Sequence, residues 1–215
     1  MGNFCGLNDT IQQDEKLKDL DPEYGVIQIG SSESKVENFG MVVSDFFTLN
    51  EDQKAAIAKY GLHQPVVDSH APIRQAKTEK TRHEGQFFNG KRQGIGHYMD
   101  ESGNLVVGKF QDDHLKVDSA VYFTNGDFMK ISSLADKNRK MSNFSGYCSL
   151  WYRNGGRYEG NYLNGKKHGQ GKMTWIDGSF YQGAWKEGVQ DGEGVFTDAS
   201  GTVSQGKFVN GRKTK

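Results

Sequence analysis

The chain has 215 residues with 27 basic and 27 acidic side chains, so its formal net charge is zero. Glycine contributes 28 residues and proline only 3, while aromatic residues make up 12%, a composition that favours many short strands joined by tight turns. The two cysteines and the absence of an apolar run of ~18 residues argue against disulfide-rich secreted proteins and membrane-spanning proteins.

The first residues are typical of an acylation signal. Gly2 would carry myristate after removal of Met1, and Cys5 could take palmitate. Gly6 stands where such signals usually have Ser or Thr, and no basic cluster follows. Two hypotheses therefore stay open, a lipid anchor at Gly2 and Cys5 and an ordinary start of the chain.

An apolar segment and a short helix are predicted next. Residues Phe39 to Leu49 form the densest apolar run of this part, and we expect them to pack on the first hairpin or on a partner. Asn50 and Gln53 form a capping-box pattern, and Gly61 supplies a stop, so a helix is predicted near residues 50–60.

Charge and glycine content both divide the chain near residue 75. Residues 1–75 hold 12 acidic and 6 basic side chains, net −6, whereas residues 76–215 hold 15 acidic and 21 basic side chains, net +6. Six glycines lie in the first part and 22 in the second. We therefore predict an N-terminal extension over residues 1–82 and a second domain over residues 83–215.

A glycine repeat dominates the second domain. The steps from Gly85 to Gly108, from Gly160 to Gly183 and from Gly183 to Gly206 are all 23 residues. A fixed period of this size predicts a stacked-repeat architecture. An aromatic residue follows each of these glycines two positions later: Phe87, Phe110, Tyr162, Trp185 and Phe208.

The middle copies of the repeat are degenerate. Val117 and Ser119 replace the Gly-x-Gly of the second copy, and Cys148 takes the second glycine position of the third. A six-residue insertion, placed at Ser132–Lys137, restores the phase and yields five full copies and a truncated sixth. In the degenerate copies, side chains would enter the space that glycine leaves for close packing. We therefore predict a kink or a break over Asp112–Cys148.

Within one copy the residues predict a β-hairpin. Tyr158, Gly160 and Tyr162 share one face of a strand, and Gly160 leaves room there for a neighbouring ring. Trp175 lies on one face of the returning strand, and an Asp-Gly pair then leads into the next copy. The predicted fold class is mainly β, an elongated, twisted antiparallel sheet of stacked hairpins with polar residues on its other face.

The pattern resembles the MORN-repeat family. The resemblance covers residues 83–215 and rests on Tyr158-Glu159-Gly160-x-Tyr162, Gly165, His168-Gly169-x-Gly171 and Asp177-Gly178, and on the next copy, Tyr181-Gln182-Gly183-Ala184-Trp185. It implies an interaction scaffold of the kind found in the cytoskeleton, cilia and membrane junctions. Some MORN proteins were proposed to bind anionic phospholipid, and MORN enzymes carry their chemistry in a separate domain.

The residues indicate no catalytic chemistry. Nucleophile-elbow, Walker and Cys-x-x-Cys motifs are absent, and the six histidines are isolated. We therefore expect no catalytic residue, no metal, no cofactor and no small-molecule substrate. The phased aromatics are assigned to the hairpin core instead of to base stacking, so no nucleic-acid partner is expected.

The sequence thus favours a non-enzymatic scaffold in a cytoskeletal or ciliary assembly. It would bind other proteins and self-associate through the open ends of the hairpin stack. The alternative is a cytoplasmic-face membrane adaptor anchored by Gly2 and Cys5, with Lys166, Lys167, Arg212 and Lys213 near lipid. Either protein would be cytoplasmic, and its repeat core and groove would comprise Phe87, Phe110, Tyr158, Gly160, Tyr162, Trp175, Tyr181, Gly183, Trp185 and Phe208.

Overall fold

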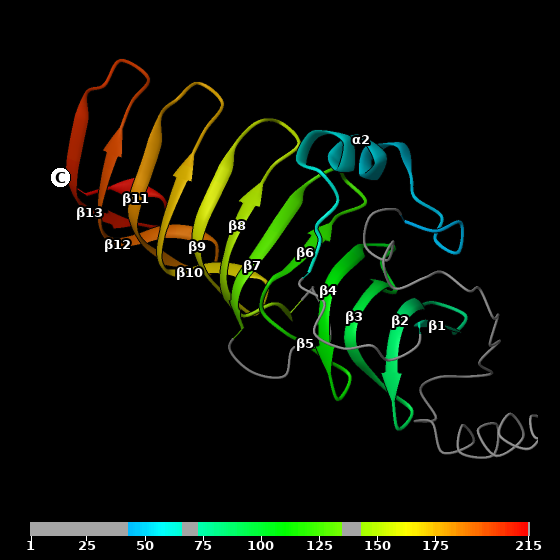
Figure 1. Cartoon of the computed structure of the whole chain (residues 1–215). Coiled ribbons are helices and arrows are strands. Elements are labelled where there is room, and N and C mark those ends of the chain that lie inside the picture. Colours follow the sequence, from blue (N-terminus) through cyan, green and yellow to red (C-terminus); the bar gives the residue numbers. More distant parts are fainter. Residues whose placement is uncertain (1–42, 66–72, 135–142, 215) are drawn as a thin grey trace, which may run out of the picture.

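The computed structural model describes residues 43–65, 73–134 and 143–214, and in this part the strands form a single antiparallel sheet (Figure 1). A helix, α2 (Glu51–Tyr60), precedes the sheet; no described helix is long and apolar enough to cross a membrane. The strands are β1 (Ile73–Lys77), β2 (Arg82–Phe88), β3 (Lys91–Met99), β4 (Leu105–Gln111), β5 (His114–Leu115), β6 (Ser119–Tyr122), β7 (Phe128–Leu134), β8 (Gly146–Trp151), β9 (Arg157–Leu163), β10 (Lys166–Thr174), β11 (Phe180–Lys186), β12 (Val189–Thr197), β13 (Val203–Val209) and β14 (Arg212–Lys213).

Two kinds of tight turn join the strands. Two-residue turns have left-handed backbone at both positions, as at Asn164 (φ 50°) and Gly165 (φ 75°), the geometry that matches the twist of the flanking strands. In the other kind, a glycine N–H donates to the carbonyl three residues earlier. This second bond recurs in five successive copies, at Gly103, Gly126, Gly155, Gly178 and Gly201.

One row of residues crosses the sheet at the glycine positions of the repeat. Within β7 and β8, Ile131 pairs with Cys148, which is 17 residues away, whereas Gly160 and Gly171 of a regular hairpin are 11 apart. The difference equals the predicted six-residue insertion, which therefore lies between Ile131 and Cys148, the interval that contains the predicted Ser132–Lys137. The row runs Gly85, Gly96, Gly108, Ser119, Ile131, Cys148, Gly160, Gly171, Gly183, Gly194, Gly206.

Of the predicted kink or break across Asp112–Cys148, the break is wrong, because β4, β6, β7 and β8 pair in succession. The departure is local, since residues 116–118 divide one strand of the second copy into β5 and β6. Gly94 has a left-handed backbone (φ 70°), but Val117 occupies the matching position, and the left-handed residue is Asp118 instead (φ 61°). A β-branched residue disfavours positive φ, and aspartate tolerates it.

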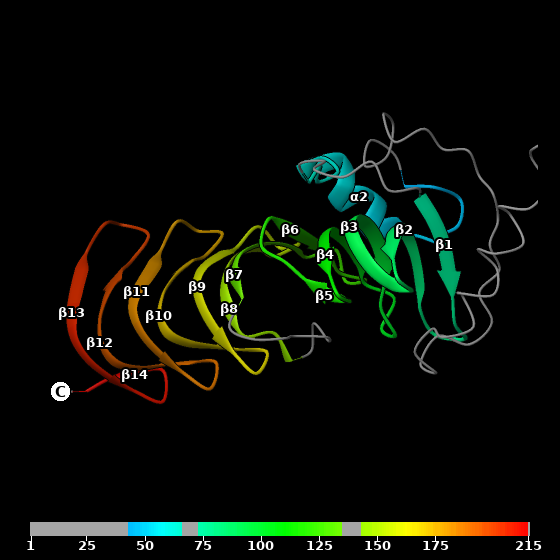
Figure 2. The same ribbon diagram turned by 60° about the horizontal axis from the view of Figure 1, so that its bottom comes forward.

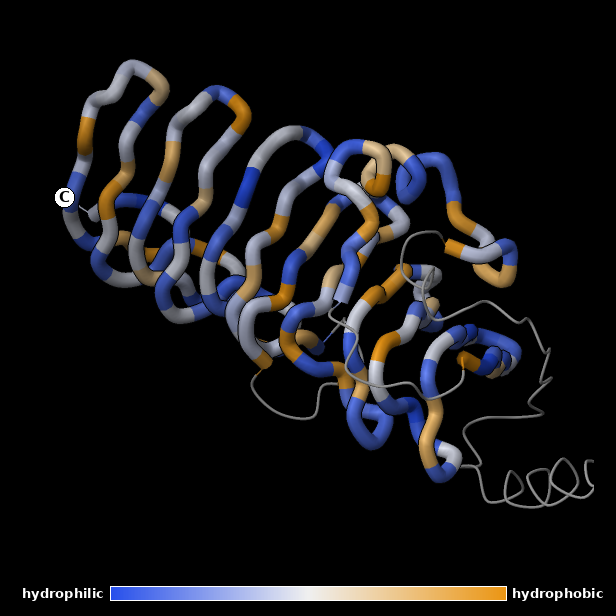
Figure 3. Tube along the Cα trace, viewed as in Figure 1, coloured by the Kyte–Doolittle hydropathy of each residue, from blue (hydrophilic) through white to orange (hydrophobic). Residues whose placement is uncertain are grey.

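The two faces of the sheet pack against different groups. The aromatic face carries Tyr158, Tyr181 and Trp185, which belong to one buried cluster that extends from β4 to β13. The helix face carries a second cluster over β3 to β8, with Tyr122 and Phe128 among its members. α2 covers this second cluster over the middle strands of the sheet, near β6 to β8 (Figures 1 and 2). Hydrophobic residues are interspersed with hydrophilic ones along the strands, as Figure 3 shows.

The expectation of a polar second face is wrong for the first half of the sheet. Val107 is fully buried on the helix face, whereas the matching residues of regular copies are Glu159 and Gln182. The described part of the N-terminal apolar run packs here, with Phe47 buried among the cluster residues. As expected, this run contacts the first hairpin, since Phe47 lies edge-on to His97 of β3 and the Ser44 hydroxyl donates to Glu84 of β2.

The predicted helix is present, and it is anchored to the sheet by its own cap. The Gln53 N–H donates to the Asn50 side chain, and the Asn50 N–H donates to the Gln53 side chain. The buried Gln53 amide then donates to the carbonyls of Gly103 (2.9 Å) and Tyr122 (3.1 Å). The Tyr122 hydroxyl donates to the carbonyl of Gly61 (2.6 Å), so both ends of α2 are bonded to the sheet.

Candidate functional site

In the regular copies a tyrosine lies over the glycine row. The Tyr158 hydroxyl donates to the carbonyl of Asn161, and the Tyr181 hydroxyl donates to the carbonyl of Ala184, each at 3.0 Å. A Cβ at Gly160 would lie 2.5 Å from the neighbouring strand's backbone and 2.6 Å from the Tyr158 hydroxyl. The glycine is therefore required for this close approach of ring and strand.

Ring contacts connect neighbouring copies. The Trp185 ring lies edge-on to Tyr158 (5.4 Å between centroids) and to Tyr181 (5.3 Å), and Tyr181 is 4.9 Å from Phe208. The Trp185 indole N–H donates to the carbonyl of Gly171 (3.0 Å). Tyr158, Tyr181, Trp185, Phe208 and also Phe110 are buried. These predicted groove residues thus form the packed interior of the repeat.

Other rings of the aromatic face are only half-buried. Tyr152, Tyr162, Trp175 and Phe196, which we call the aromatic strip, pack against the cluster with one side and keep part of their surface accessible. Trp175 and Phe196 contact each other with centroids 6.0 Å apart. Phe87 is also half-buried and contacts the His83 ring at 5.1 Å.

Cations lie among these rings, a feature that the sequence did not lead us to expect. The Lys167 ammonium is 4.6 Å from the Trp185 ring centroid and 5.4 Å from that of Tyr158. The Arg92 guanidinium is 4.7 Å from the Tyr98 ring in the first copy. Burial lowers the pKa of Lys167 below its ordinary value. The available signal was the repeat itself, because Arg92 and Lys167 occupy matching positions after their turns.

The four basic residues predicted near lipid divide between the two faces of the sheet, because each adjacent couple lies within one strand. Lys166 and Lys167 are adjacent in β10 and point to opposite faces. Lys166 is exposed and pairs with Glu187 (2.7 Å), whereas Lys167 lies over the rings. Lys213 pairs across the strands with buried Phe208, and its ammonium donates to the Ser204 hydroxyl (3.0 Å).

Several predicted features remain outside this geometry. Gly2 and Cys5 lie outside the described residues, so acylation stays a prediction. Cys148 is fully buried, and burial raises the pKa of its thiol to about 12. Over residues 43–65, 73–134 and 143–214, no group of three or more His, Cys, Asp or Glu side chains is placed to hold a metal.

The phased hairpins, the glycine row and the ring over it can now be compared with known proteins. The family model of the MORN repeat matches residues 83–105, 158–180 and 181–203. The chain contains MORN repeats. The matched segments are the first, fourth and fifth copies of the 23-residue period. Residues 106–157 are unmatched, yet the copies there keep the strand order and the cross-strand row of the matched ones.

Two further comparisons add little about this MORN-repeat chain. Comparison with curated protein sequences gives no match. Among solved structures, the wild-type TCP10 domain of Danio rerio CPAP, in complex with a peptide of Danio rerio STIL, is 12% identical. It covers 66% of this chain and 99% of its own, with a TM-score of 0.17, too low to support an argument.

Proposed function

We propose that this MORN-repeat protein is a non-enzymatic scaffold that binds other proteins through the aromatic face of its sheet. The aromatic strip is the observation that carries this proposal. Aromatic side chains are enriched in the buried centres of protein interfaces, where they supply much of the binding energy. The strip lies on the face opposite α2, so a partner can contact it without displacing the helix.

The finer proposal concerns the cellular setting. The resemblance to MORN proteins supports a role as a subunit of a cytoskeletal or ciliary assembly in the cytoplasm. A rigid sheet suits this role, because a preformed surface loses little conformational entropy when a partner binds.

Substitution of Trp175 tests the scaffold proposal. The change Trp175→Gln should sharply reduce the proteins recovered with the tagged full chain from its native cells, measured by quantitative mass spectrometry. The matched control is Ile176→Gln, because Ile176 is the next residue and is 79% exposed at the hairpin tip. Equal recovery with the wild-type protein and both variants, at equal melting temperatures, would count against the aromatic face as the binding surface.

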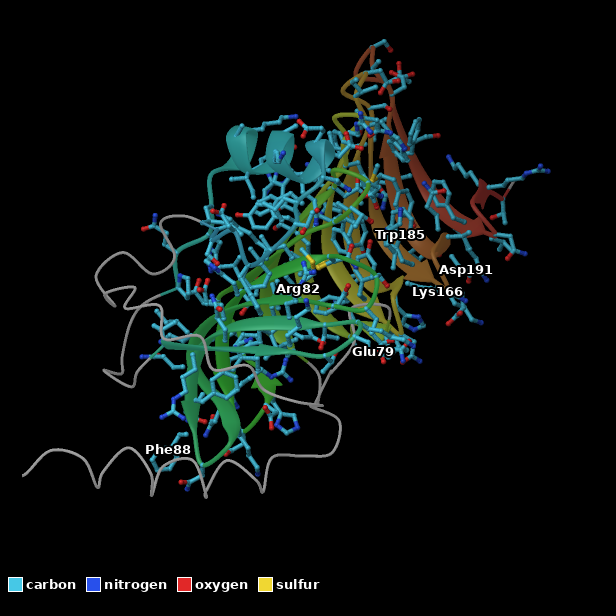
Figure 4. The ribbon with its side chains drawn as sticks, turned by 90° about the vertical axis from the view of Figure 1, so that its right-hand side faces the viewer. Glu79, Arg82, Phe88, Lys166, Trp185 and Asp191 are labelled. Atoms are coloured by element: carbon cyan, nitrogen blue, oxygen red, sulfur yellow. The ribbon has the colours of Figure 1, made fainter. Side chains whose placement is uncertain are left out.

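A specific observation also favours the membrane alternative as a second candidate. Four of the five described two-residue turns are flanked by one exposed apolar and one basic side chain. Phe88, 65% exposed, and Lys166 lie at turn ends of the sheet (Figure 4). Anionic headgroups attract basic side chains, and apolar side chains enter the interface. The four pairs are Phe88 and Lys91, Leu163 and Lys166, Lys186 and Val189, and Val209 and Arg212.

Vesicle flotation tests this second candidate. Unacylated full chain should float with vesicles containing phosphatidylserine and not with phosphatidylcholine vesicles, and salt should weaken the binding. Replacing both Lys166 and Arg212 by Gln should reduce flotation, whereas Lys172→Gln, a change within β10 and away from the turns, should not. Equal flotation with both vesicles would remove the electrostatic hypothesis. Mass spectrometry of the N-terminal peptide tests acylation of Gly2 and Cys5 separately.

A further inference from the structure

A recurring backbone bond joins a two-residue turn to the preceding hairpin. In each case the turn N–H donates to the carbonyl of the residue that lies four positions before a residue of the glycine row and faces the aromatic cluster. We call these couples junction pairs, because each occupies the same place in its hairpin. They are Asp113 to Arg92 (3.1 Å), Gly165 to Phe144 (2.8 Å), Gly188 to Lys167 (2.9 Å) and Gly211 to Gln190 (2.9 Å).

The first junction pair contains a cation and its carboxylate. Asp113 Oδ1 accepts from Arg92 Nε (3.3 Å) and from the Arg92 backbone N–H (2.8 Å). The two side chains are only 9% and 14% exposed. Transfer of a cation from water to an aromatic surface costs free energy unless the cation is paired with an anion. In this copy the acid of the next turn meets that requirement.

The third junction pair contains the cation without the carboxylate. Lys167 lies over the Trp185 and Tyr158 rings, as Arg92 lies over its own rings, but the matching turn residue is Gly188. Within the described residues the Lys167 ammonium contacts rings only. The adjacent acid, Glu187, bonds Lys166 (2.7 Å). A Cβ built at Gly188 would meet no atom within 4 Å, so the acid's place is open.

We propose that the open place beside Lys167 and Gly188 receives a carboxylate from a partner protein. The partner segment carries an Asp or Glu flanked by apolar side chains, which rest on the aromatic strip. The carboxylate completes the arrangement that Asp113 completes within the first copy. A charge-assisted contact inside an apolar surface fixes the register of the bound segment and rejects a neutral one. This inference rests on the proposed function, because both place the partner on the aromatic face.

Three substitutions isolate this contact. Lys167→Met removes the charge and keeps a long apolar stem over the rings. Gly188→Asp supplies an internal carboxylate at the open place, as Asp113 does in the first copy. Gly188→Asn is its matched control, because Asn has the same size, no charge and the same tolerance of the positive φ (92°) at this position.

The probe is a peptide selected from a random library on the full-length wild-type protein. It is synthesised twice, once with its acidic residue and once with the corresponding amide. We expect the acidic peptide to bind about tenfold more tightly. That preference should disappear in Lys167→Met and in Gly188→Asp and persist in Gly188→Asn. Melting curves confirm that each variant is folded.

The outcomes separate this inference from the proposed function. Peptides that need Trp175 but show no preference for the acid would overturn the carboxylate site and leave the scaffold proposal standing. The carboxylate site would also be overturned if Lys167→Met kept the preference. Failure to select any peptide that depends on Trp175 would count against both.

Zero-length carbodiimide coupling identifies the occupant. Lys167 should couple to a carboxylate of the bound acidic peptide and lose this product when the amide peptide is used. Coupling in the free protein to an acid of residues 1–42, or to a second copy of the chain, would place that occupant on the site and overturn the assignment to a partner.

Discussion

His83 occupies the position that tyrosine holds in the regular copies, and its ring is 1% exposed. It contacts the Phe87 and Phe110 rings, and among the described residues neither ring nitrogen has a hydrogen-bond partner. Burial, followed by the charges of Arg92 and His97, lowers the pKa of His83 well below 6.5. Burial alone lowers the pKa of His97 to about 4.

These pKa shifts predict a loss of stability in acid. Both histidines stay neutral in the folded protein, whereas the unfolded chain takes up protons below pH 6.5. Stability is therefore complete above about pH 6.5 and should fall by about 2 kcal/mol per histidine by pH 5. His83→Phe should remove about half of the loss between pH 7 and pH 5, measured by urea unfolding. An equal loss in the variant would contradict this assignment.

Gly160 shows how little space the glycine row leaves. Alanine there would contact the opposite strand at 2.5 Å and the Tyr158 hydroxyl at 2.6 Å. We expect Gly160→Ala to lower the free energy of unfolding by about 2–3 kcal/mol, because neither strand can move apart without breaking its pairing. Gly178→Asn is the control, since Gly178 has a positive φ and no atom within 4 Å of its Cβ position. Equal effects would mean that crowding is not the cause.

At the scale of elements, α2 and the apolar helix face of β3 to β8 depend on each other. Gln53 carries the polar part of this contact, since its buried amide satisfies two carbonyls of the sheet. Tyr60 adds a stacked contact with Phe128 at 4.8 Å. The helix is short and mostly polar, so its stability depends on this packing.

Substitution of Gln53 tests that dependence. Gln53→Ala should destabilise the protein by about 2 kcal/mol, because the Gly103 and Tyr122 carbonyls lose their donor and the capping box is broken. Hydrogen exchange should show early loss of protection in α2. Lys54→Ala, on the exposed side of the same helix, should change stability by less than about 0.5 kcal/mol. A neutral Gln53→Ala would mean that the helix is held by its apolar contacts alone.

At the scale of the whole molecule, the sheet is covered unevenly. Strands β3 to β8 are packed on both faces, whereas the helix face of β9 to β13 carries polar or exposed residues such as Glu159, Gln182 and Gln205. In a stacked-repeat protein each hairpin is stabilised by its neighbours and by its own packing. The two halves should therefore differ in local stability.

Native-state hydrogen exchange at increasing urea checks this difference. Amides of β11 to β13 should exchange first, at free energies below that of global unfolding, and amides of β4, β6 and β7 should exchange last. Identical protection along the whole sheet would show that the repeat unfolds as one cooperative unit.

Much of the architecture follows from local rules. Each hairpin is determined by about 23 neighbouring residues, through turn glycines with positive φ and an aromatic residue two positions after the repeat glycine. The period, the strands and the ring positions could therefore be predicted. The candidate site was predicted only in part. The sequence assigned Trp185 and Tyr158 to the hairpin core, and both lie in one buried cluster, but it assigned Lys167 to lipid, whereas Lys167 lies over the Trp185 ring.

The sequence by itself therefore determined the repeat, the hairpin and the cap of α2, because each depends on residues close together in the chain. Only the tertiary structure decided that the degenerate copies continue the sheet and that their apolar second face is covered by a helix. The Gln53 contact with Tyr122 joins residues 69 apart. The open place beside Lys167 was likewise decided by the stacking of neighbouring turns, because Gly188 occupies beside Lys167 the position that Asp113 occupies beside Arg92.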